Sequence, residues 1–281
     1  MSRQFQERLV FLLITLAALA TVTPIVLVVG YIAWKGLPAV SWEFLSAVPR
    51  DGMRAGGIWP AIVGTLYLTL GTGVIAVPLG VAAAIYLSEY AKDNSLTRAI
   101  RIAIINLAGI PSVVYGLFGL GLFVLFLRFG TSIVAGCLTL SIMTLPVIIS
   151  TAEEALRSVP QSFRVVSISL GGTKWQTIWR IVLPQALPGI LTGVILGLER
   201  AAGETAPILF TAAAFFLPRL PDSPFDATMA LPYHLFVIST QVPGMPIQIQ
   251  YGTALVLLVF VLGMMLIATV IRSRARARRQ W

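Results

Sequence analysis

The stretch from Leu9 to Trp34 reads LVFLLITLAALATVTPIVLVVGYIAW and carries no charged side chain. A helix of about 20 apolar residues crosses the hydrocarbon core of a bilayer, so this stretch decides the fold class. A cleavable signal peptide is the alternative, because Arg3 and Arg8 precede the run and Ala18-Leu19-Ala20 resembles a cleavage site. The run continues through Pro24 and is too long for a signal core. The sequence therefore predicts a membrane-spanning helix here.

The composition of the whole chain extends this prediction. Of the 281 residues, 57% are hydrophobic and only 11% are charged, whereas about 25% of the residues in an ordinary soluble domain are charged. Six apolar stretches are long enough to span, at about 9–34, 60–88, 102–127, 132–152, 184–217 and 251–271, and only the fifth is interrupted by charged residues. The sequence predicts an all-α integral membrane protein with six transmembrane helices in one domain over 1–281. It excludes a soluble globular protein and leaves no room for a separate soluble enzyme domain.

The 20 basic residues are distributed unevenly across this topology. If both termini lie on one side, the segments on that side hold fourteen basic residues, including the tail from Arg272 to Arg279, and the opposite segments hold five. Basic residues favour the cytoplasmic side, so we expect both termini in the cytoplasm. Most of the net charge of +9 is then a topological signal and not a nucleic-acid-binding surface. Arg200 remains, inside a predicted span.

The few reactive side chains argue against chemistry in this chain. The single cysteine, Cys137, and the single histidine, His234, form neither a disulfide framework nor a metal cluster, and we expect both to be structural. A P-loop requires Gly-Lys-Ser or Gly-Lys-Thr, and none of the three lysines follows a glycine. The sequence thus predicts no catalytic and no metal site. If ATP drives this protein, a partner must bind it.

The segment from about 153 to 183 is the one substantial hydrophilic element. It predicts two short helices joined at Gly171-Gly172, the first interrupted at Pro160 and the second beginning after Thr173 as its N-cap. Its aromatic side chains, Trp175 among them, exceed what a solvated loop requires. They lie either in the lipid interface or against another protein.

This loop resembles a cytoplasmic motif of the ABC importer permeases. The motif reads EAA, three residues, Gly, nine residues, Ile, one residue, Leu-Pro, and the chain has Gly171, Ile181 and Leu183-Pro184 at that spacing. The leading EAA is absent, because Val165-Val166-Ser167 stands in its place. Other stretches resemble the phosphate-specific branch of that family: GGIWPAIVGTL (56–66), AIYLSEYA (84–91), NLAGIPSVVYGLFGLGLF (106–123) and GETAPILFTA (203–212). The last of these resembles the A-type subunit more than the C-type subunit.

The resemblance implies a type I ABC importer permease fold and a pathway for phosphate across a bacterial inner membrane. The implied partners are a second homologous permease, two ATP-binding cassette ATPase subunits and an extracytoplasmic phosphate-binding protein. The chain needs no cofactor of its own, since ATP and magnesium belong to the ATPase. In the family, the loop forms a coupling helix that inserts into a cleft of the ATPase. The residues that this implies here are Phe163, Arg164, Ser167, Gly171, Gly172, Lys174 and Trp175.

Arg200 and Glu204 carry charge at membrane depth. Arg200 lies roughly 24 Å along a helix counted from Pro184, and an ionised side chain near the bilayer centre costs at least about 2.5 kcal/mol. The pair should therefore face protein or water. Three glycines precede the pair on a stripe of about 80°, which lets another helix approach closely. These glycines are Gly189, Gly193 and Gly197.

Two interpretations of this pair remain open. In the first, the guanidinium of Arg200 binds phosphate oxygens, and Glu204 holds it when no anion is present. In the second, the two residues form a buried ion pair that only fixes the helix register. Glu199 points about 100° away from Arg200 and is given no function.

Three polar residues of the predicted third span are weaker candidates for lining the pathway: Asn106, Ser112 and Tyr115. Pro111 with Ser112 has the alternative role of satisfying backbone groups at a kink. Two other functions also stay open. One is the same kind of machine acting on another oxyanion or solute, and the other is a secondary transporter or channel that works without ATP.

Overall fold

The computed structural model describes residues 3–277, with side chains for residue 7 and residues 10–274. Five helical stretches of the described chain are long and apolar enough to cross a membrane. They contain α1 (Arg3–Gly36), α3 (Trp59–Ile85), α6 (Ile133–Arg157), α9 (Leu183–Gly203) and α12 (Ile247–Ala277). A sixth span results if the bent pair of α4 (Ser95–Ala108) and α5 (Ser112–Gly119) is counted as one. The predicted all-α membrane fold is confirmed.

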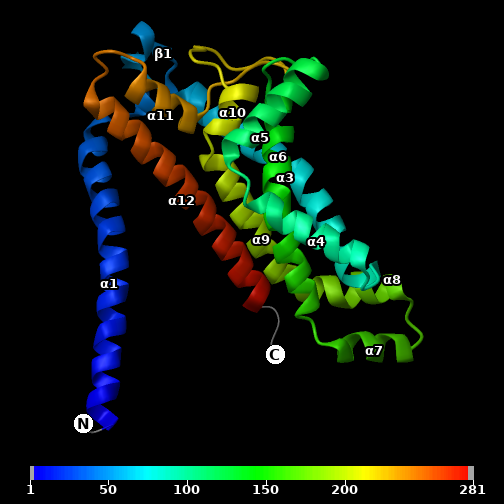
Figure 1. The fold of residues 1–281 in the computed structure, drawn as a ribbon. Coiled ribbons are helices and arrows are strands. Elements are labelled where there is room, and N and C mark those ends of the chain that lie inside the picture. Colours follow the sequence, from blue (N-terminus) through cyan, green and yellow to red (C-terminus); the bar gives the residue numbers. More distant parts are fainter. Residues whose placement is uncertain (1–2, 278–281) are drawn as a thin grey trace.

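Short elements close the two ends of the bundle (Figure 1). What we call the hairpin end carries η1 (Leu37–Ala39), α2 (Trp42–Ser46), β1 (Pro49–Arg50), η2 (Asp51–Met53), β2 (Ala55–Gly56), α10 (Ala206–Thr211) and α11 (Leu231–Thr240). Strands β1 and β2 are antiparallel, with Pro49 opposite Gly56. The opposite end, which we call the loop end, carries α7 (Gln161–Ser169) and α8 (Lys174–Thr177). The start of α1 and the end of α12 both point toward the loop end.

Three π-helical segments interrupt or extend these helices: η3 (Tyr86–Tyr90), η4 (Leu120–Phe126) and η5 (Ile178–Val182). Segment η3 continues α3 toward the loop end, η4 continues α5, and η5 joins α8 to α9. Such segments are rare and often accompany functional sites. Two of the three flank the hydrophilic loop.

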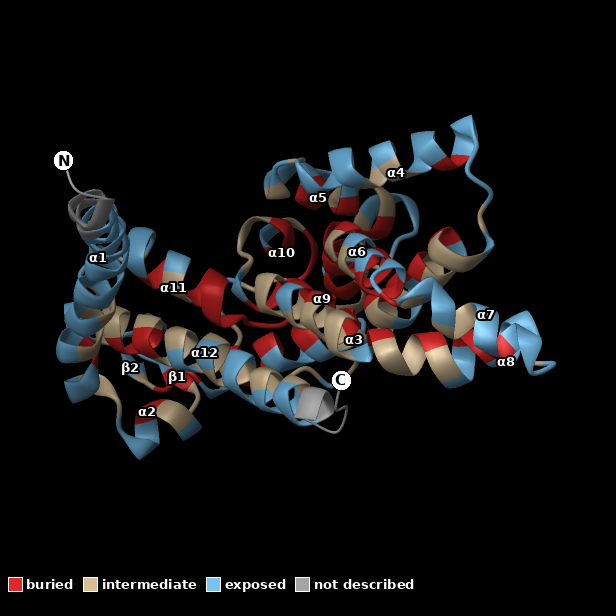
Figure 2. Ribbon diagram, turned by 90° about the horizontal axis from the view of Figure 1, so that it is seen from below, coloured by how far each residue is buried: buried red, intermediate tan, exposed pale blue. Residues whose placement is uncertain are grey.

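Helices α3, α6 and α9 form the buried centre of the bundle (Figure 2). Small residues let these helices approach one another. A Cβ atom added at Gly80 would lie 2.7 Å from Cγ2 of Ile148, and one added at Gly193 would lie 2.6 Å from Cβ of Thr151. Close van der Waals packing of this kind holds helices together in lipid, where no hydrophobic driving force brings them together.

Helix α1 stands apart from this centre and meets the remainder of the chain near its C-terminal end, against α12 (Figure 1). The rings of Tyr31 and Tyr251 meet edge to face with centroids 5.6 Å apart. Most of its apolar side chains, such as Leu12 and Ile25, are more than half exposed. A surface of this composition suits a lipid environment.

The stretch 102–127, predicted as one span, is divided at residues 109–111. Helix α4 ends at Ala108, α5 begins at Ser112, and the two helices are bent by 101°. Pro111 lacks a backbone N–H and disfavours helical backbone in the residue before it, which explains the break. The stretch is therefore a broken helix, in line with the kink that the sequence allows at Pro111 and Ser112.

The predicted fifth span, 184–217, also has different bounds. Its helix begins earlier, because α8, η5 and α9 are continuous from Lys174 to Gly203. It ends earlier as well, since Glu204 is extended with ψ 136° and Pro207 opens the next short helix. The predicted loop 153–183 correspondingly loses its first residues to α6, which continues to Arg157.

The residues expected to be structural lie in the interior. Cys137 is 4% exposed on α6, and His234 is 2% exposed on α11 at the hairpin end. Burial lowers the pKa of His234 to about 4, and its Nδ1 has no hydrogen-bond partner among the described residues. Helix α11 is fixed to α3 by the backbone N–H of Leu231, which donates to Oγ1 of Thr65 over 2.8 Å.

Candidate functional site

Arg200 and Glu204 lie where α9 ends and the chain turns toward α10. Nε of Arg200 and Oε1 of Glu204 are 3.2 Å apart, and the two side chains are 34% and 17% exposed. No other hydrogen bond reaches this guanidinium from the described residues. Its two terminal nitrogens are therefore available to a ligand. The ion pair forms although Glu204 lies one residue beyond the helix.

The glycine stripe that leads to Arg200 packs against α6. The atom nearest to a Cβ added at Gly193 is Cβ of Thr151 at 2.6 Å, and for Gly197 it is Cγ1 of Ile148 at 3.0 Å. Along its glycines the stripe is thus a packed helix interface. Its middle, at Gly193 and Gly197, is buried, and its last turn with Arg200 is partly exposed.

Tyr115 is the most deeply packed of the three polar candidates in the broken span. It is buried, and its hydroxyl donates to the Leu107 carbonyl over 2.7 Å, which ties α5 to α4 across the bend. It also interacts electrostatically with Arg200. Ser112 is half-buried at the first position of α5, and Asn106 is exposed on α4 beyond the bend.

Two charges near this site were not assigned by sequence reasoning. Arg272, counted with the basic tail, lies against α9, where its Nη1 donates to Oγ1 of Thr192 over 3.4 Å. It also interacts electrostatically with Glu199. Oε1 of Glu199 is buried without a hydrogen-bond partner among the described residues. The contact joins residues 80 positions apart, so no local pattern indicates it.

The hydrophilic loop has the predicted turn and cap. Gly171 has φ +83°, a conformation that glycine adopts at no steric cost. Oγ1 of Thr173 accepts a hydrogen bond from the N–H of Gln176 over 3.2 Å, and the Gln176 side chain accepts one from the N–H of Thr173 over 2.9 Å. This reciprocal capping box starts α8 at the predicted residue.

Ser167 lies inside the loop. Its hydroxyl is 2.8 Å from that of Thr177, and a Cβ added at Gly172 would lie 2.8 Å from its carbonyl oxygen. Val165 and Val166, which stand where the family motif has Glu and Ala, are more than half exposed. The outer face at the position of the missing glutamate is therefore apolar.

The aromatic side chains of the loop divide between its two faces. Trp175 is 60% exposed, and its ring centroid is 5.2 Å from that of Trp179, which is also exposed. Lys174 places Nζ 4.7 Å from the centroid of the Tyr90 ring on η3. Phe163, in contrast, packs against the apolar cluster at the loop end of the bundle.

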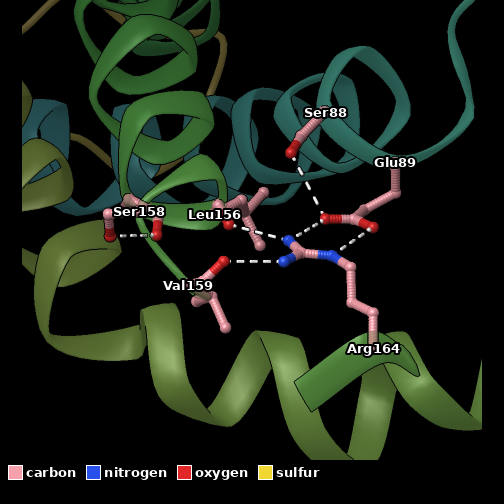
Figure 3. A network of polar contacts seen from close by, with 7 residues as sticks. Ser88, Glu89, Leu156, Ser158, Val159 and Arg164 are labelled. Carbon is pink, nitrogen blue, oxygen red and sulfur yellow. Dashed lines mark hydrogen bonds and ion pairs between the residues drawn. The ribbon is translucent and has the colours of Figure 1, made fainter. Parts of the chain in front are cut away.

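Arg164 is directed into the bundle and not toward the outer face of the loop (Figure 3). Its side chain is 12% exposed, and its Nη2 lies 2.6 Å from Oε1 of Glu89, which is 8% exposed. It also donates to the carbonyls of Leu156 and Val159. Glu89 was not singled out from the sequence, because its partner lies 75 residues away.

A second ion-pair group lies beside the first. Oε1 of Glu153 on α6 is 2.8 Å from Nε of Arg101 on α4 and 2.9 Å from Nη2 of Arg157. Nη2 of Arg101 also donates to the carbonyl of Leu87 on η3 over 2.9 Å. These contacts tie the ends of three helices together at the loop end.

The chemistry at the two sites is electrostatic. Within residues 3–277, no group of three or more His, Cys, Asp or Glu side chains is arranged to hold a metal ion. The site at Arg200 offers an arginine fork that suits an anion. The loop end offers a fixed polar loop with exposed tryptophans that suits docking.

Relatives of known class match most of the chain. A family model described as "Binding-protein-dependent transport system inner membrane component" matches residues 76–278. Phosphate transport system permease protein PstA 1 of Mycobacterium tuberculosis H37Rv is 38% identical over 227 residues, which cover 80% of this chain and 73% of that protein. The probable ABC transporter permease protein YqgI of Bacillus subtilis is 32% identical over 253 residues, covering 86% of each.

Solved structures share the fold at low sequence identity. A bacterial ABC transporter involved in the import of the acidic polysaccharide alginate matches with a TM-score of 0.69 at 14% identity, covering 97% of this chain and 99% of that chain. The inward-facing MetNI methionine ABC transporter matches with a TM-score of 0.59 at 18% identity, covering 78% and 94%. The fold is that of the type I ABC importer permeases.

Proposed function

Because the chain belongs to the family of binding-protein-dependent transport system inner membrane components, we propose that it is the A-type membrane subunit of an ATP-driven phosphate importer. Relatives named as PstA from Mycobacterium, Methanocaldococcus and Xylella are 30–38% identical over most of this chain and support the substrate class. In this proposal the chain forms a translocation pathway with a second permease. Two ATPase subunits and an extracytoplasmic phosphate-binding protein complete the machine.

The observation that carries the proposal is the geometry of Arg200. Its Nε is held by Glu204 over 3.2 Å, whereas the described residues leave its terminal nitrogens free. A guanidinium fork binds two phosphate oxygens at once. Glu204 keeps the site from holding the anion too tightly, since transport requires that the anion also leave.

Movement of the loop reaches Arg200 along a single helical stretch. The residues from Lys174 to Gly203 are continuous, so the loop and Arg200 occupy opposite parts of one helix. We assign the outer face of the loop, with Trp175 and Trp179, to contact with an ATPase subunit. That subunit binds ATP and magnesium, and its movement tilts α9. The anion site then opens to one side of the membrane or the other.

The sidedness follows from the charges. Basic residues concentrate in the segments at the loop end, so in this proposal the loop end and both termini face the cytoplasm of a bacterial cell. The hairpin end faces the phosphate-binding protein. The test is a reporter enzyme that works only in the cytoplasm, fused after Trp281. We expect this fusion to be active.

The substrate is tested with the complex in proteoliposomes. We expect vanadate-sensitive uptake of labelled phosphate, weak competition by sulfate, and a loss of about 100-fold in Arg200→Gln, because hydrogen bonds to charged groups contribute about 1.5–3 kcal/mol. Arg219→Gln is the matched control, since Arg219 is an exposed arginine paired with Asp222 at the hairpin end. Efficient competition by another oxyanion would favour that solute. Vanadate-insensitive uptake by the chain alone would favour a secondary transporter.

A further inference from the structure

Helix α7 has little packing against the transmembrane bundle. It packs chiefly on α8 and η5, which belong to the same loop. Phe163 is the apolar side chain through which α7 reaches the cluster at the loop end. A cavity of about 420 Å³ lies between the loop and the ends of α3 and α6, lined by Glu89, Arg164 and Lys174 among others. Movement of α7 therefore reaches α9 directly, because α8 and η5 continue into that helix, whereas its routes to α3 and α6 are few.

Arg164 bridges this gap with four hydrogen bonds (Figure 3). Its Nη2 and Nε donate to the two oxygens of Glu89 over 2.6 and 3.2 Å, which is a bidentate fork. Its Nη1 donates to the carbonyl of Val159 over 2.7 Å, and its Nη2 also donates to the carbonyl of Leu156 over 2.9 Å. These carbonyls belong to the last turn of α6 and to the connection that follows it. The guanidinium thus joins α7 to two different transmembrane helices.

Glu89 is well placed to receive a force. It lies on η3, the π-helical continuation of α3, and Ser88 beside it also donates to its Oε1 over 3.3 Å. Helix α3 packs along both α6 and α9. A displacement of Glu89 therefore acts on the helices that surround and carry Arg200. The bidentate geometry resists sliding in a way that a single contact does not.

We propose that the Arg164–Glu89 pair is the element that transmits the movement of α7 to α3 and α6, so that Arg164 is a positioning residue for transport. Arg164 then does not contact the ATPase, although it lies in the loop that does. The inference rests on the proposed function, because it requires an ATPase to move the loop. Its consequence is that α7, η3 and the end of α6 shift as one unit during the cycle.

A lysine cannot replace this arginine. The ammonium group of lysine is a point charge that retains attraction to Glu89 but lacks the planar fork, so it cannot serve the carboxylate and both carbonyls together. We expect Arg164→Gln to lower the phosphate transported per ATP hydrolysed about tenfold, with ATP hydrolysis changed less than twofold. We expect Arg164→Lys to lower that ratio about threefold. Glu89→Gln should resemble Arg164→Gln, and Arg98→Gln, an exposed arginine on α4, serves as the control.

Spin-label distances separate transmission from simple support of the fold. Labels are placed at Ser162→Cys on α7 and Asp93→Cys just beyond η3, with Cys137 replaced by Ala. In the otherwise native complex, the distance should stay within about 2 Å between nucleotide-free and vanadate-trapped states. In Arg164→Gln it should change by several ångströms. A constant distance in Arg164→Gln, or an unchanged transport ratio, overturns the proposal.

Three further outcomes concern assembly, the ATPase and the transported solute. If Arg164→Gln does not assemble with the ATPase, Arg164→Lys and Glu89→Gln are measured in the same two assays with the same criteria. If no ATPase co-purifies with the native chain, the proposed function fails, and the inference fails with it. If the native complex hydrolyses ATP but moves another solute, only the substrate assignment fails, and the ratio is measured with that solute.

Discussion

The chain contains two arginine–glutamate pairs of similar chemistry and opposite construction. Arg164 and Glu89 come from distant parts of the sequence and are 12% and 8% exposed. Arg164 donates four hydrogen bonds, two to Glu89 and two to backbone carbonyls. Arg200 and Glu204 are four residues apart, are 34% and 17% exposed, and share one hydrogen bond of 3.2 Å. A guanidinium with four of its five N–H groups hydrogen-bonded holds structure together. One that keeps donors free can bind a ligand.

The difference has an energetic counterpart. Breaking a buried pair leaves an uncompensated charge and typically costs about 3–5 kcal/mol, whereas a pair that is less buried and joined by one hydrogen bond is easier to open. The first pair is therefore suited to remain intact through a transport cycle. The second is weak enough for an anion to displace the carboxylate.

The largest effect on the less buried pair is expected for Arg200→Lys. The lysine keeps the positive charge but binds one phosphate oxygen where arginine binds two, so we expect the uptake rate to fall about 30-fold, which corresponds to about 2 kcal/mol. Initial rates of labelled phosphate uptake measure it. Uptake at the native rate in both Arg200→Lys and Arg200→Gln would leave the pair with a purely structural role.

Acidification is expected to affect the hairpin end independently of either pair. His234 has a native pKa of about 4, below its unfolded value of about 6.5, so its contribution to stability is complete above pH 6.5. As the pH falls below 6.5, the unfolded state binds a proton that the native state excludes, and about 2 kcal/mol should be lost by pH 5. Thermal unfolding at pH 7 and pH 5 measures this loss. It should disappear in His234→Leu, and an equal loss there would assign the effect to another group.

The packing that supports Arg200 is tested at the glycine stripe. Gly193→Ala brings a methyl group 2.6 Å from Cβ of Thr151, and we expect about 1–2 kcal/mol of destabilisation from overpacking. Gly30→Ala is the matched control, because nothing lies within 4 Å of a Cβ added on α1. Thermal unfolding of the purified complex gives both values. The double variant Gly193→Ala/Thr151→Gly should recover most of the loss, and a failure to recover would place the strain elsewhere.

The smallest effect is expected for Glu204→Gln. Removing the carboxylate frees Arg200 for the anion, so we expect phosphate to bind more tightly and leave more slowly. The KM for phosphate should fall about fivefold together with the maximal rate. A higher KM would mean that Glu204 positions Arg200 for the anion and does not compete with it.

Much of the fold was predictable, because hydropathy and charge asymmetry are strong signals in membrane proteins. The all-α fold, the turn at Gly171 and the cap at Thr173 followed from local rules. The break at Pro111 was only partly predictable. A proline in a span permits a kink, but the 101° bend depends on Tyr115 reaching the Leu107 carbonyl and on α5 packing against α10.

The sites divide in the same way. The contact of Arg200 with Glu204 follows from spacing along one helix. The contacts of Arg164 with Glu89 and of Arg272 with Thr192 join residues 75 and 80 positions apart, and nothing local to either arginine indicates its partner. The resemblance to a family motif assigned Arg164 to the loop as a whole. Only the tertiary structure shows that its side chain turns inward.

The separation of roles between the two arginines is tested most directly by measuring phosphate uptake and ATP hydrolysis together in Arg200→Gln and Arg164→Gln proteoliposomes. Arg200→Gln should raise the KM for phosphate, because the anion loses its binding group. Arg164→Gln should leave that KM within about twofold and lower the phosphate transported per ATP. If both variants change the same parameter to the same extent, the two pairs do not have the different roles that their geometry assigns them.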